Sequence, residues 1–296
     1  MIQSETINSR DNSLLKRARA ARDGRESELI FLEGLRLCEE AVRVSSLTID
    51  AVLFTKKLFD DERGRDLLAA FERAHRRAAQ VDEKLFASLS DTKTPQGIIV
   101  LAERPRTDRE TFARRIEVEP RPIVATHQTV GPHETDAARE ASAPLLVIMH
   151  RINNPANAGA MLRVAEASGA TGVITTAGST DCFSPKALRG AMGSTLRLPL
   201  WTDVDFADAL AWCAARNIGT VGTDVRAGQT HTGIDWTTPR AIILGEEGRG
   251  LTTDEAGATD QRIKIPMRAP VESLNVAVAL GVILYEAARQ RGNLCS

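Results

Sequence analysis

The half of the chain from residue 144 onward alternates short apolar runs with helical patterns, and no other feature constrains the fold as strongly. We expect strands at LLVIM, GVIT, GTVGT, AIILG and RIKIP, which begin at residues 145, 172, 219, 241 and 262. Helices are expected near 156–168, 185–192, 205–216 and 273–290. Strands that alternate with helices favour a mostly parallel sheet that is covered on both faces. The sequence therefore predicts an α/β domain over residues 144–296.

The first 105 residues alternate the same two patterns over shorter lengths. Helices are expected near 12–21, at 34–43 and near 62–76, and strands at 29–34, 50–55, 78–81 and 97–102. This order indicates a smaller α/β domain over residues 1–105. Residues 106–143 have weak periodicity and several prolines. We expect a linker or an insertion there, with 121–128 as its one candidate strand.

The composition excludes several classes of protein. The net charge is −1, so the chain is no polycation, although a local basic face would suffice to bind nucleic acid. The four cysteines and five histidines show neither CxxC nor HExxH, so we expect no metal. No apolar run reaches the ~20 residues that span a membrane, and the N-terminal residues lack the apolar core of a signal peptide. We expect a cytoplasmic protein without membrane association.

Two loops after predicted strands are candidate sites, because open α/β sheets bind ligands at the carboxyl ends of their strands. In RINNPANAGAMLR, Asn157 is a candidate N-cap and Arg163 shares a helix face with Gly159. In LGEEGRGL, Glu247 stands among glycines, which let a ligand approach the backbone closely. The alternatives are a solvated arginine behind a capping asparagine, and a tight strand-to-helix turn.

A third candidate loop leads into the helix at 273–290, which begins SLNVAVALGVIL. These residues are apolar on every face, so we expect the helix to be buried all round, with Ser273 as its N-cap. Asn275 lies in the first turn, where free backbone N–H groups suit an anion or a polar ligand edge. Alternatively, Asn275 only binds a neighbouring loop carbonyl.

Taken in order, these three loops resemble the sequence motifs of one family. Asn157-x-Gly159-x-x-x-Arg163, then LGEEGRGL, then IPM and SLNVAVA are similar to the motifs of the SpoU/TrmH family of RNA 2′-O-ribose methyltransferases, in the SPOUT superfamily. FSPKALRGAMGSTLRLP, between the first two motifs, also resembles this family. INSRDNSLLKRARAARDGRESELIFLEGLRLCEEAV and TPQGIIVLAERP resemble its small N-terminal α/β RNA-binding domain.

The resemblance implies a parallel sheet with a deep C-terminal trefoil knot, S-adenosyl-L-methionine as the cofactor, and a homodimer. It implies catalytic roles for Asn157, Arg163, Glu247, Ser273 and Asn275. It also implies cofactor binding by Leu244, Gly245, Glu247, Gly250, Ile265, Met267, Ser273, Leu274 and Asn275. Because a guanidinium stays protonated, we expect Arg163 to stabilise negative charge and not to act as a base. Arg163 is also expected to serve the pocket of the partner subunit.

RNA is the implied substrate, and residues 10–25 provide a local basic segment. They hold six Lys or Arg residues against two acidic ones, a local net charge of +4 that suits phosphates unless it is only a solvated helix face. The expected RNA-binding residues are Lys16, Arg17, Arg19, Arg22, Arg25 and Arg189. Ribosomal RNA is favoured because the accessory N-terminal domain is typical of the family's rRNA enzymes. A tRNA 2′-O-methyltransferase, a catalytically silent RNA-binding SPOUT protein and a base-methylating SPOUT enzyme are the alternatives.

Overall fold

The computed structural model describes residues 5–73, 77–118 and 143–292. Contacts between residues divide the chain into two compact units. Unit 1 comprises Met1–Arg106 together with Asp181–Arg197, and unit 2 comprises Thr107–Thr180 together with Leu198–Ser296. Unit 1 therefore includes a short segment from the second half of the chain.

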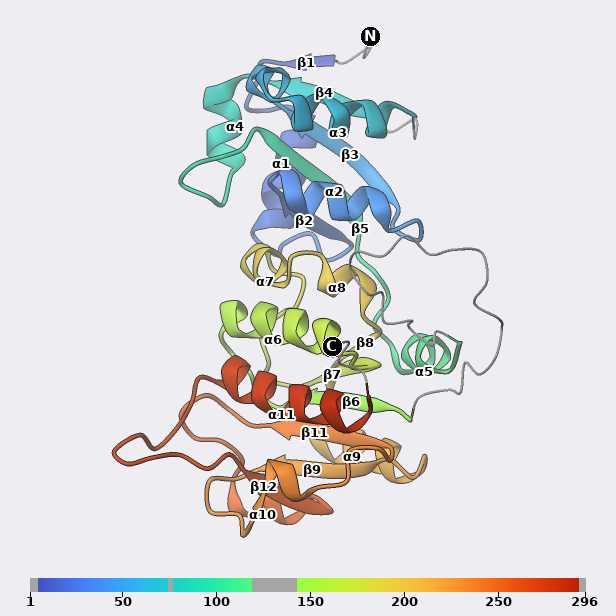
Figure 1. Cartoon of the computed structure of the whole chain (residues 1–296). Coiled ribbons are helices and arrows are strands. Elements are labelled where there is room, and N and C mark those ends of the chain that lie inside the picture. The colour runs from blue at the N-terminus through green and yellow to red at the C-terminus, as the bar shows by residue number, and fades with distance from the viewer. Residues whose placement is uncertain (1–4, 74–76, 119–142, 293–296) are drawn as a thin grey trace, which may run out of the picture. The chain divides into compact units, whose positions relative to one another are not determined.

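Unit 1 is built on a five-stranded mixed sheet of order β1-β4-β3-β5-β2 (Figure 1). Its strands are β1 (Glu5–Ile7), β2 (Leu29–Glu33), β3 (Ile49–Phe54), β4 (Ala78–Val81) and β5 (Ile98–Glu103). β5 runs antiparallel to both β2 and β3, so it starts where those two strands end. The helices are α1 (Ser13–Arg22), α2 (Leu35–Arg43), α3 (Glu62–Arg73), α4 (Glu83–Leu89), α7 (Pro185–Ala191), α8 (Ser194–Arg197) and the 3-10 helix η1 (Lys56–Asp60).

Both faces of the unit 1 sheet are covered by helices. α1 and α4 share one core with alternate residues of the strands, among them Leu15, Phe31 and Phe86. α2 and α3 pack on each other, and α2 also contacts β2 and β5. The predicted strands and helices of residues 1–105 are present, but β1, η1 and the short helix α4 were not predicted.

Unit 2 contains a seven-stranded sheet of order β10-β12-β9-β11-β6-β7-β8, in which every pairing is parallel. This confirms the predicted parallel sheet. The strands are β6 (Leu145–Met149), β7 (Gly172–Thr176), β8 (Leu200–Val204), β9 (Gly219–Thr223), β10 (Gln229–Thr230), β11 (Arg240–Leu244) and β12 (Gln261–Lys264). The helices are α5 (Arg109–Val118), α6 (Pro155–Ala167), α9 (Phe206–Ala214), α10 (Thr253–Gly257), α11 (Val276–Gln290) and the 3-10 helix η2 (His231–Gly233).

Two groups of helices enclose this parallel sheet. α5, α9 and α10 share one core with β6, β7 and β11, which includes Phe112 and Trp212. α6 and α11 contact each other and lie side by side (Figure 1). A Cβ atom built on Gly281 of α11 would lie 3.6 Å from the Val164 side chain of α6, an ordinary van der Waals distance, so the two helices are in contact at this position. Among the described residues, no helix combines the length and the apolar character needed to cross a membrane.

The structure adds detail to the segment 106–143 and differs from two expectations for the C-terminal helix. Part of the segment, expected to be a linker or an insertion, forms α5, in which Phe112 is fully buried and its ring packs against Gly172. The candidate strand at 121–128 lies outside the described residues. The C-terminal helix begins at Val276, with Asn275 as N-cap, and not at Ser273. It is also not buried all round in the single chain, since Val278 is 54% exposed and Tyr285 is 47% exposed.

Candidate active site

A cavity of about 610 Å³ opens at the carboxyl ends of β9, β11 and β12. Three loops line it: the residues after β9, the turn after β11, and the segment that links β12 to α11. Its wall contains all nine residues for which the sequence predicts cofactor binding: Leu244, Gly245, Glu247, Gly250, Ile265, Met267, Ser273, Leu274 and Asn275. The fold therefore brings residues from three separate motifs into one cavity.

Three of the predicted catalytic side chains form a hydrogen-bonded chain at this cavity. Asn275 accepts hydrogen bonds through Oδ1 from the backbone N–H groups of Ala277 (3.0 Å) and Val278 (3.4 Å), which caps α11. Its Nδ2 therefore faces away and donates to Asn157 Oδ1 over 3.1 Å. Asn157 Nδ2 in turn donates to Glu247 Oε1 over 3.0 Å. Each amide thus has a fixed orientation, because one end of the chain is set by backbone donors and the other by a carboxylate.

The turn after β11 requires its glycines. A Cβ atom on Gly245 would lie 2.3 Å from the backbone carbon of Gly250, and Gly248 and Gly250 have positive φ angles of 79° and 69°. Gly250 N–H donates to the Glu246 carbonyl over 2.7 Å, which closes the turn. The loop is therefore a tight turn, as the alternative interpretation of LGEEGRGL expected. It also presents its backbone and Glu247 to the cavity.

The structure corrects three further predictions about this site. Asn157 is not an N-cap, because the Asn154 side chain accepts from Ala156 N–H over 2.9 Å and Asn157 lies within α6. Ser273 caps no helix, and it is exposed at the cavity rim. Asn275 is exposed at the cavity, although the helix that it begins was expected to be buried all round.

Arg163 is placed apart from the other predicted catalytic residues. It is exposed on α6 and does not line the cavity of its own chain. Within the described residues its side chain has no hydrogen bond or ion pair.

Sequence reasoning missed polar residues at the carboxyl end of β9. Asp224 and Arg226 line the cavity, and Arg226 N–H and Nε donate to Asp224 Oδ1 over 2.9 and 3.2 Å. Burial raises the pKa of the Asp224 carboxyl, but the bonds from Arg226 outweigh it and hold the pKa below its ordinary value. Their position directly after the predicted strand GTVGT was the signal that could have identified them.

All six residues predicted to bind RNA have partners within unit 1. The ion pairs are Lys16–Asp11 (3.2 Å), Arg17–Asp50 (3.1 Å), Arg22–Asp23 (2.7 Å), Arg25–Asp23 (2.7 Å) and Arg189–Asp91 (2.6 Å), and Arg19 donates to the Arg10 carbonyl over 3.1 Å. Hydrogen bonds from Arg22 and Arg25 hold the pKa of Asp23 below its ordinary value. Folding thus offsets much of the local charge that the sequence shows.

Cysteine chemistry and metal binding receive no support from the described residues. They contain no group of three or more His, Cys, Asp or Glu residues placed to hold a metal ion. Cys182 and Cys213 are buried free thiols, and burial raises the pKa of each to about 12, so neither is a thiolate nucleophile at neutral pH.

The sheet is parallel with helices on both faces, and its cavity lies at the carboxyl ends of the strands. This arrangement is that of α/β proteins that bind a small molecule at their strand ends. The sequence pattern of the SpoU rRNA Methylase family matches residues 144–285. The pattern named RNA 2′-O ribose methyltransferase substrate binding matches residues 31–107.

Known proteins resemble the chain over half of its length or more. It is 30% identical over 261 residues to the 23S rRNA (guanosine-2′-O-)-methyltransferase RlmB of Ralstonia nicotianae, which covers 88% of this chain and 96% of that protein. It is 39% identical over 149 residues to the uncharacterized tRNA/rRNA methyltransferase slr1673 of Synechocystis, a match that covers 50% of this chain and 54% of that protein. The SpoU methyltransferase AviRb of Streptomyces viridochromogenes, solved with the cofactor AdoMet, superposes with a TM-score of 0.75 at 26% identity, covering 95% of this chain and 98% of AviRb. The chain belongs to the SpoU family of RNA 2′-O-ribose methyltransferases, as its motifs predicted.

Proposed function

We propose that this protein transfers the methyl group of S-adenosylmethionine to a ribose 2′-hydroxyl of ribosomal RNA. The observation that carries the proposal is the chain Asn275–Asn157–Glu247 at the edge of a cavity lined by all nine predicted cofactor residues. RlmB of Ralstonia nicotianae, similar over most of its length, is named for this reaction on 23S rRNA. AviRb is named as a SpoU methyltransferase with bound AdoMet.

The residues of the cavity fit this cofactor. Its volume of about 610 Å³ lies within the roughly 300–1,000 Å³ of small-molecule sites. Leu244, Ile265 and Met267 offer apolar surface to the adenosine, and Glu247 offers a carboxylate to a ligand with cationic groups. The cofactor supplies an electrophilic methyl group bound to a sulfonium.

The protein's own residues then orient the nucleophile. The fixed amide of Asn157 and the Ser273 hydroxyl at the rim can position a ribose and its phosphates by hydrogen bonds, and alignment is the main requirement of such a displacement. Arg163 stays protonated, so it binds phosphate and stabilises the developing alkoxide without acting as the base.

A homodimer completes the site in this proposal. Val278, Val282 and Tyr285 on α11, together with Leu274 just before its N-cap, form an apolar stripe whose side chains are 37–54% exposed in the single chain. Exposed apolar stripes of this kind mark interaction sites. Arg163, on the neighbouring helix α6, serves the cavity of the partner subunit. The same proposal includes the trefoil knot of the family, formed by the loops around the cavity. It also includes a cytoplasmic location, where ribosomal RNA is available.

The test is methyl transfer with labelled S-adenosylmethionine to transcribed ribosomal RNA, with transcribed tRNA in parallel. The expected product is a 2′-O-methyl nucleotide, seen as a dinucleotide that resists alkaline hydrolysis. Label on bases alone would overturn the ribose assignment, and label on tRNA alone would overturn the choice of ribosomal RNA.

A further inference from the structure

We infer that unit 1 binds the RNA backbone at the ends of β2 and β3, on a surface formed by Lys56, Lys57, Phe59 and Lys93, and not on α1. We call this the strand-end surface. The inference rests on the proposed function for its partner, an RNA strand, and adds where that strand is bound.

Backbone pairing brings the segments of this surface together. Because β5 starts where β2 and β3 end, Thr55 N–H donates to the Gly97 carbonyl over 2.9 Å and Gly34 N–H donates to the Ile98 carbonyl over 3.2 Å. The Gln96 side chain accepts from Leu35 N–H over 3.0 Å. Lys56 and Lys57 directly follow Thr55, and Lys93 stands three residues before Gln96. The three lysines therefore belong to one edge of the sheet.

These lysines are free to bind phosphate. Lys56, Lys57 and Lys93 are exposed, and none forms a hydrogen bond or an ion pair within the described residues. The cations of α1 are engaged in the ion pairs and the carbonyl contact described above. A phosphate must displace a carboxylate to bind most of these cations, whereas it can bind the strand-end lysines without displacing any partner. Asp60, at the end of η1, is the exposed acid nearest in sequence to the two adjacent lysines.

An exposed aromatic ring stands beside Lys56 and Lys57. Phe59 is 41% exposed, the one large apolar side chain of unit 1 that is exposed among the described residues. Its ring lies edge-on to the buried Phe54, at 5.7 Å between centroids and 84° between planes. The buried ring fixes its orientation and leaves part of it to solvent. Aromatic faces next to cations are how proteins bind single-stranded nucleic acid.

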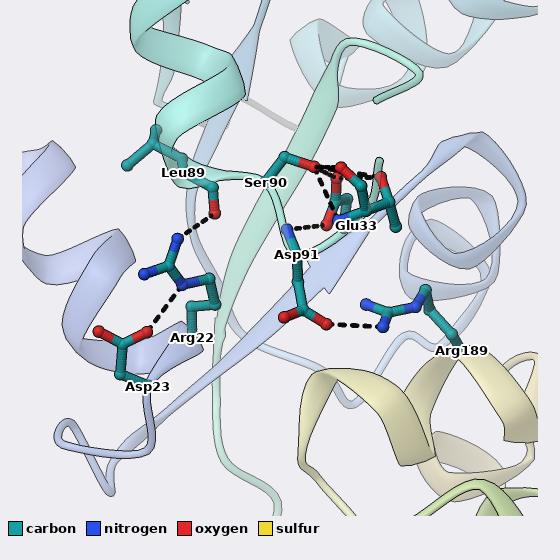
Figure 2. Close-up of polar contacts among 8 residues, drawn as sticks. Arg22, Asp23, Glu33, Leu89, Ser90, Asp91 and Arg189 are labelled. Atoms are coloured by element: carbon teal, nitrogen blue, oxygen red, sulfur yellow. Dashed lines mark hydrogen bonds and ion pairs between the residues drawn. The ribbon is translucent and has the colours of Figure 1, made fainter. Parts of the chain in front are cut away.

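A buried carboxylate holds the loop that carries Lys93. Glu33 is 4% exposed and accepts from Asp91 N–H (2.8 Å), Thr92 Oγ1 (2.9 Å) and the Ser90 hydroxyl (Figure 2). Asp91 is held in turn by Arg189 (Figure 2). A loop ordered before binding loses less conformational entropy when it binds. The substrate-binding pattern at 31–107 spans Glu33 and all four residues of the surface, and it leaves α1 outside.

The experiment compares two variants of the full chain that each lose three positive charges. The first carries Lys56→Ala, Lys57→Ala and Lys93→Ala. The control carries Lys16→Ala and Arg17→Ala on α1 and Arg25→Ala just after this helix. Binding to transcribed 23S ribosomal RNA is measured by filter retention over a range of salt concentrations. Calorimetry with S-adenosylmethionine verifies that unit 2 is intact in both variants.

The strand-end variant should bind RNA about 10- to 100-fold more weakly, with the slope of log K against log salt reduced by about 2, since each phosphate contact on a single strand contributes about 0.7. The control should change affinity less than about 3-fold. Phe59→Ala should weaken RNA binding about 10-fold. Phe59→Tyr should bind RNA as the wild-type chain does, because tyrosine keeps the stacking face. An equal or larger loss in the α1 control, or an unchanged salt slope in the strand-end variant, would overturn the inference. Absence of ribose methylation by the wild-type chain counts against the proposed function alone, because the binding comparison needs no turnover.

Discussion

The carboxyl ends of the strands are rich in polar groups in both sheets. In unit 2 these groups bond to one another, whereas in unit 1 several of them are unpaired among the described residues. In unit 2, Asn157, Glu247 and Asn275 bond to one another around a cavity of about 610 Å³. In unit 1, the buried carboxylate of Glu33 at the end of β2 binds the loop of residues 90–92. Lys56, Lys57 and Lys93 have no partners among the described residues. One edge fixes side chains around an enclosed space, and the other presents free charge on an open surface.

The difference follows from what each edge can bind. A small ligand is oriented by a few polar groups whose own directions are fixed by hydrogen bonds. A polyanion is held by many cations that release counterions, and it needs little enclosure. A local sequence motif reveals the first kind of site, whereas the second depends on which charges remain unpaired after folding.

The largest expected effect tests the hydrogen-bonded chain of unit 2. Asn157→Asp places a carboxylate beside Glu247, at an atom pair now 3.0 Å apart, and the repulsion should displace both side chains. We expect methyl transfer to fall about 100-fold, the loss typical of a misplaced catalytic group. RNA affinity should change little, as measured by filter retention.

A second substitution checks that the hydrogen bond itself is responsible. Adding Glu247→Gln to Asn157→Asp reverses donor and acceptor and restores the bond, so activity should recover by about 10-fold. No recovery, with S-adenosylmethionine binding retained, would show that the Glu247 carboxylate has a separate role and that the chain is not the decisive element.

The second prediction asks whether the edge of unit 2, unlike that of unit 1, needs a second copy of the chain. Val278→Asp puts a charge on the exposed stripe of α11 and should dissociate the proposed homodimer, because an unpaired charge at a desolvated interface is costly. Ultracentrifugation should show monomers, and methyl transfer should fall more than about 10-fold. The control is Ala211→Asp on the exposed side of α9, which should remain dimeric and active. A fully active Val278→Asp monomer would remove Arg163 of the partner from the site.

A smaller effect tests the loop of unit 1. Glu33→Ala leaves the donors of Ser90, Asp91 and Thr92 without their acceptor, which should lower the free energy of unfolding by about 1–3 kcal/mol. RNA affinity should fall about 5-fold as the Lys93 loop loses its order. Glu28→Ala, at an exposed site just before β2, is the matched control and should change neither quantity. Equal RNA affinity in the two variants would show that the loop does not need Glu33 to bind RNA.

The smallest effect concerns the ion pairs on α1. Because hydrogen bonds from Arg22 and Arg25 lower the pKa of Asp23 below its ordinary value of 3.8, the pairs stabilise the folded state above that pH. This contribution is lost as the pH falls through the lower, folded-state pKa. An NMR titration should show the shift, and Asp23→Asn should remove that part of the pH dependence. An ordinary pKa at Asp23 would mean that these arginines are free, and the contrast between α1 and the strand-end surface would weaken.

The cavity shows how far a sequence motif can be followed. The loops after β11 and β12 could each be identified from the sequence alone, because Gly245, Gly250 and the polar residue Asn275 are local signals, whereas Asp224 and Arg226 after β9 were missed. Their joining was not, since Asn157 and Glu247 are 90 residues apart and Asn157 and Asn275 are 118 apart. The family resemblance supplied that connection, and spacing alone could not.

The sequence by itself determined the parallel sheet of unit 2 and most of its strands, because periodicity and glycine positions act over a few residues and need no distant partner. Tertiary structure alone decided which residue caps the C-terminal helix and which charged side chains remain unpaired. Ser273 and Asn275 are both good N-caps by type, and the path of the loop made Asn275 the cap. Arg17 looked free until β3 brought Asp50 to it from 33 residues away. Hydrogen bonds and ion pairs depend on distance in space, so the fold that sets those distances also settles which polar side chains stay free for a ligand.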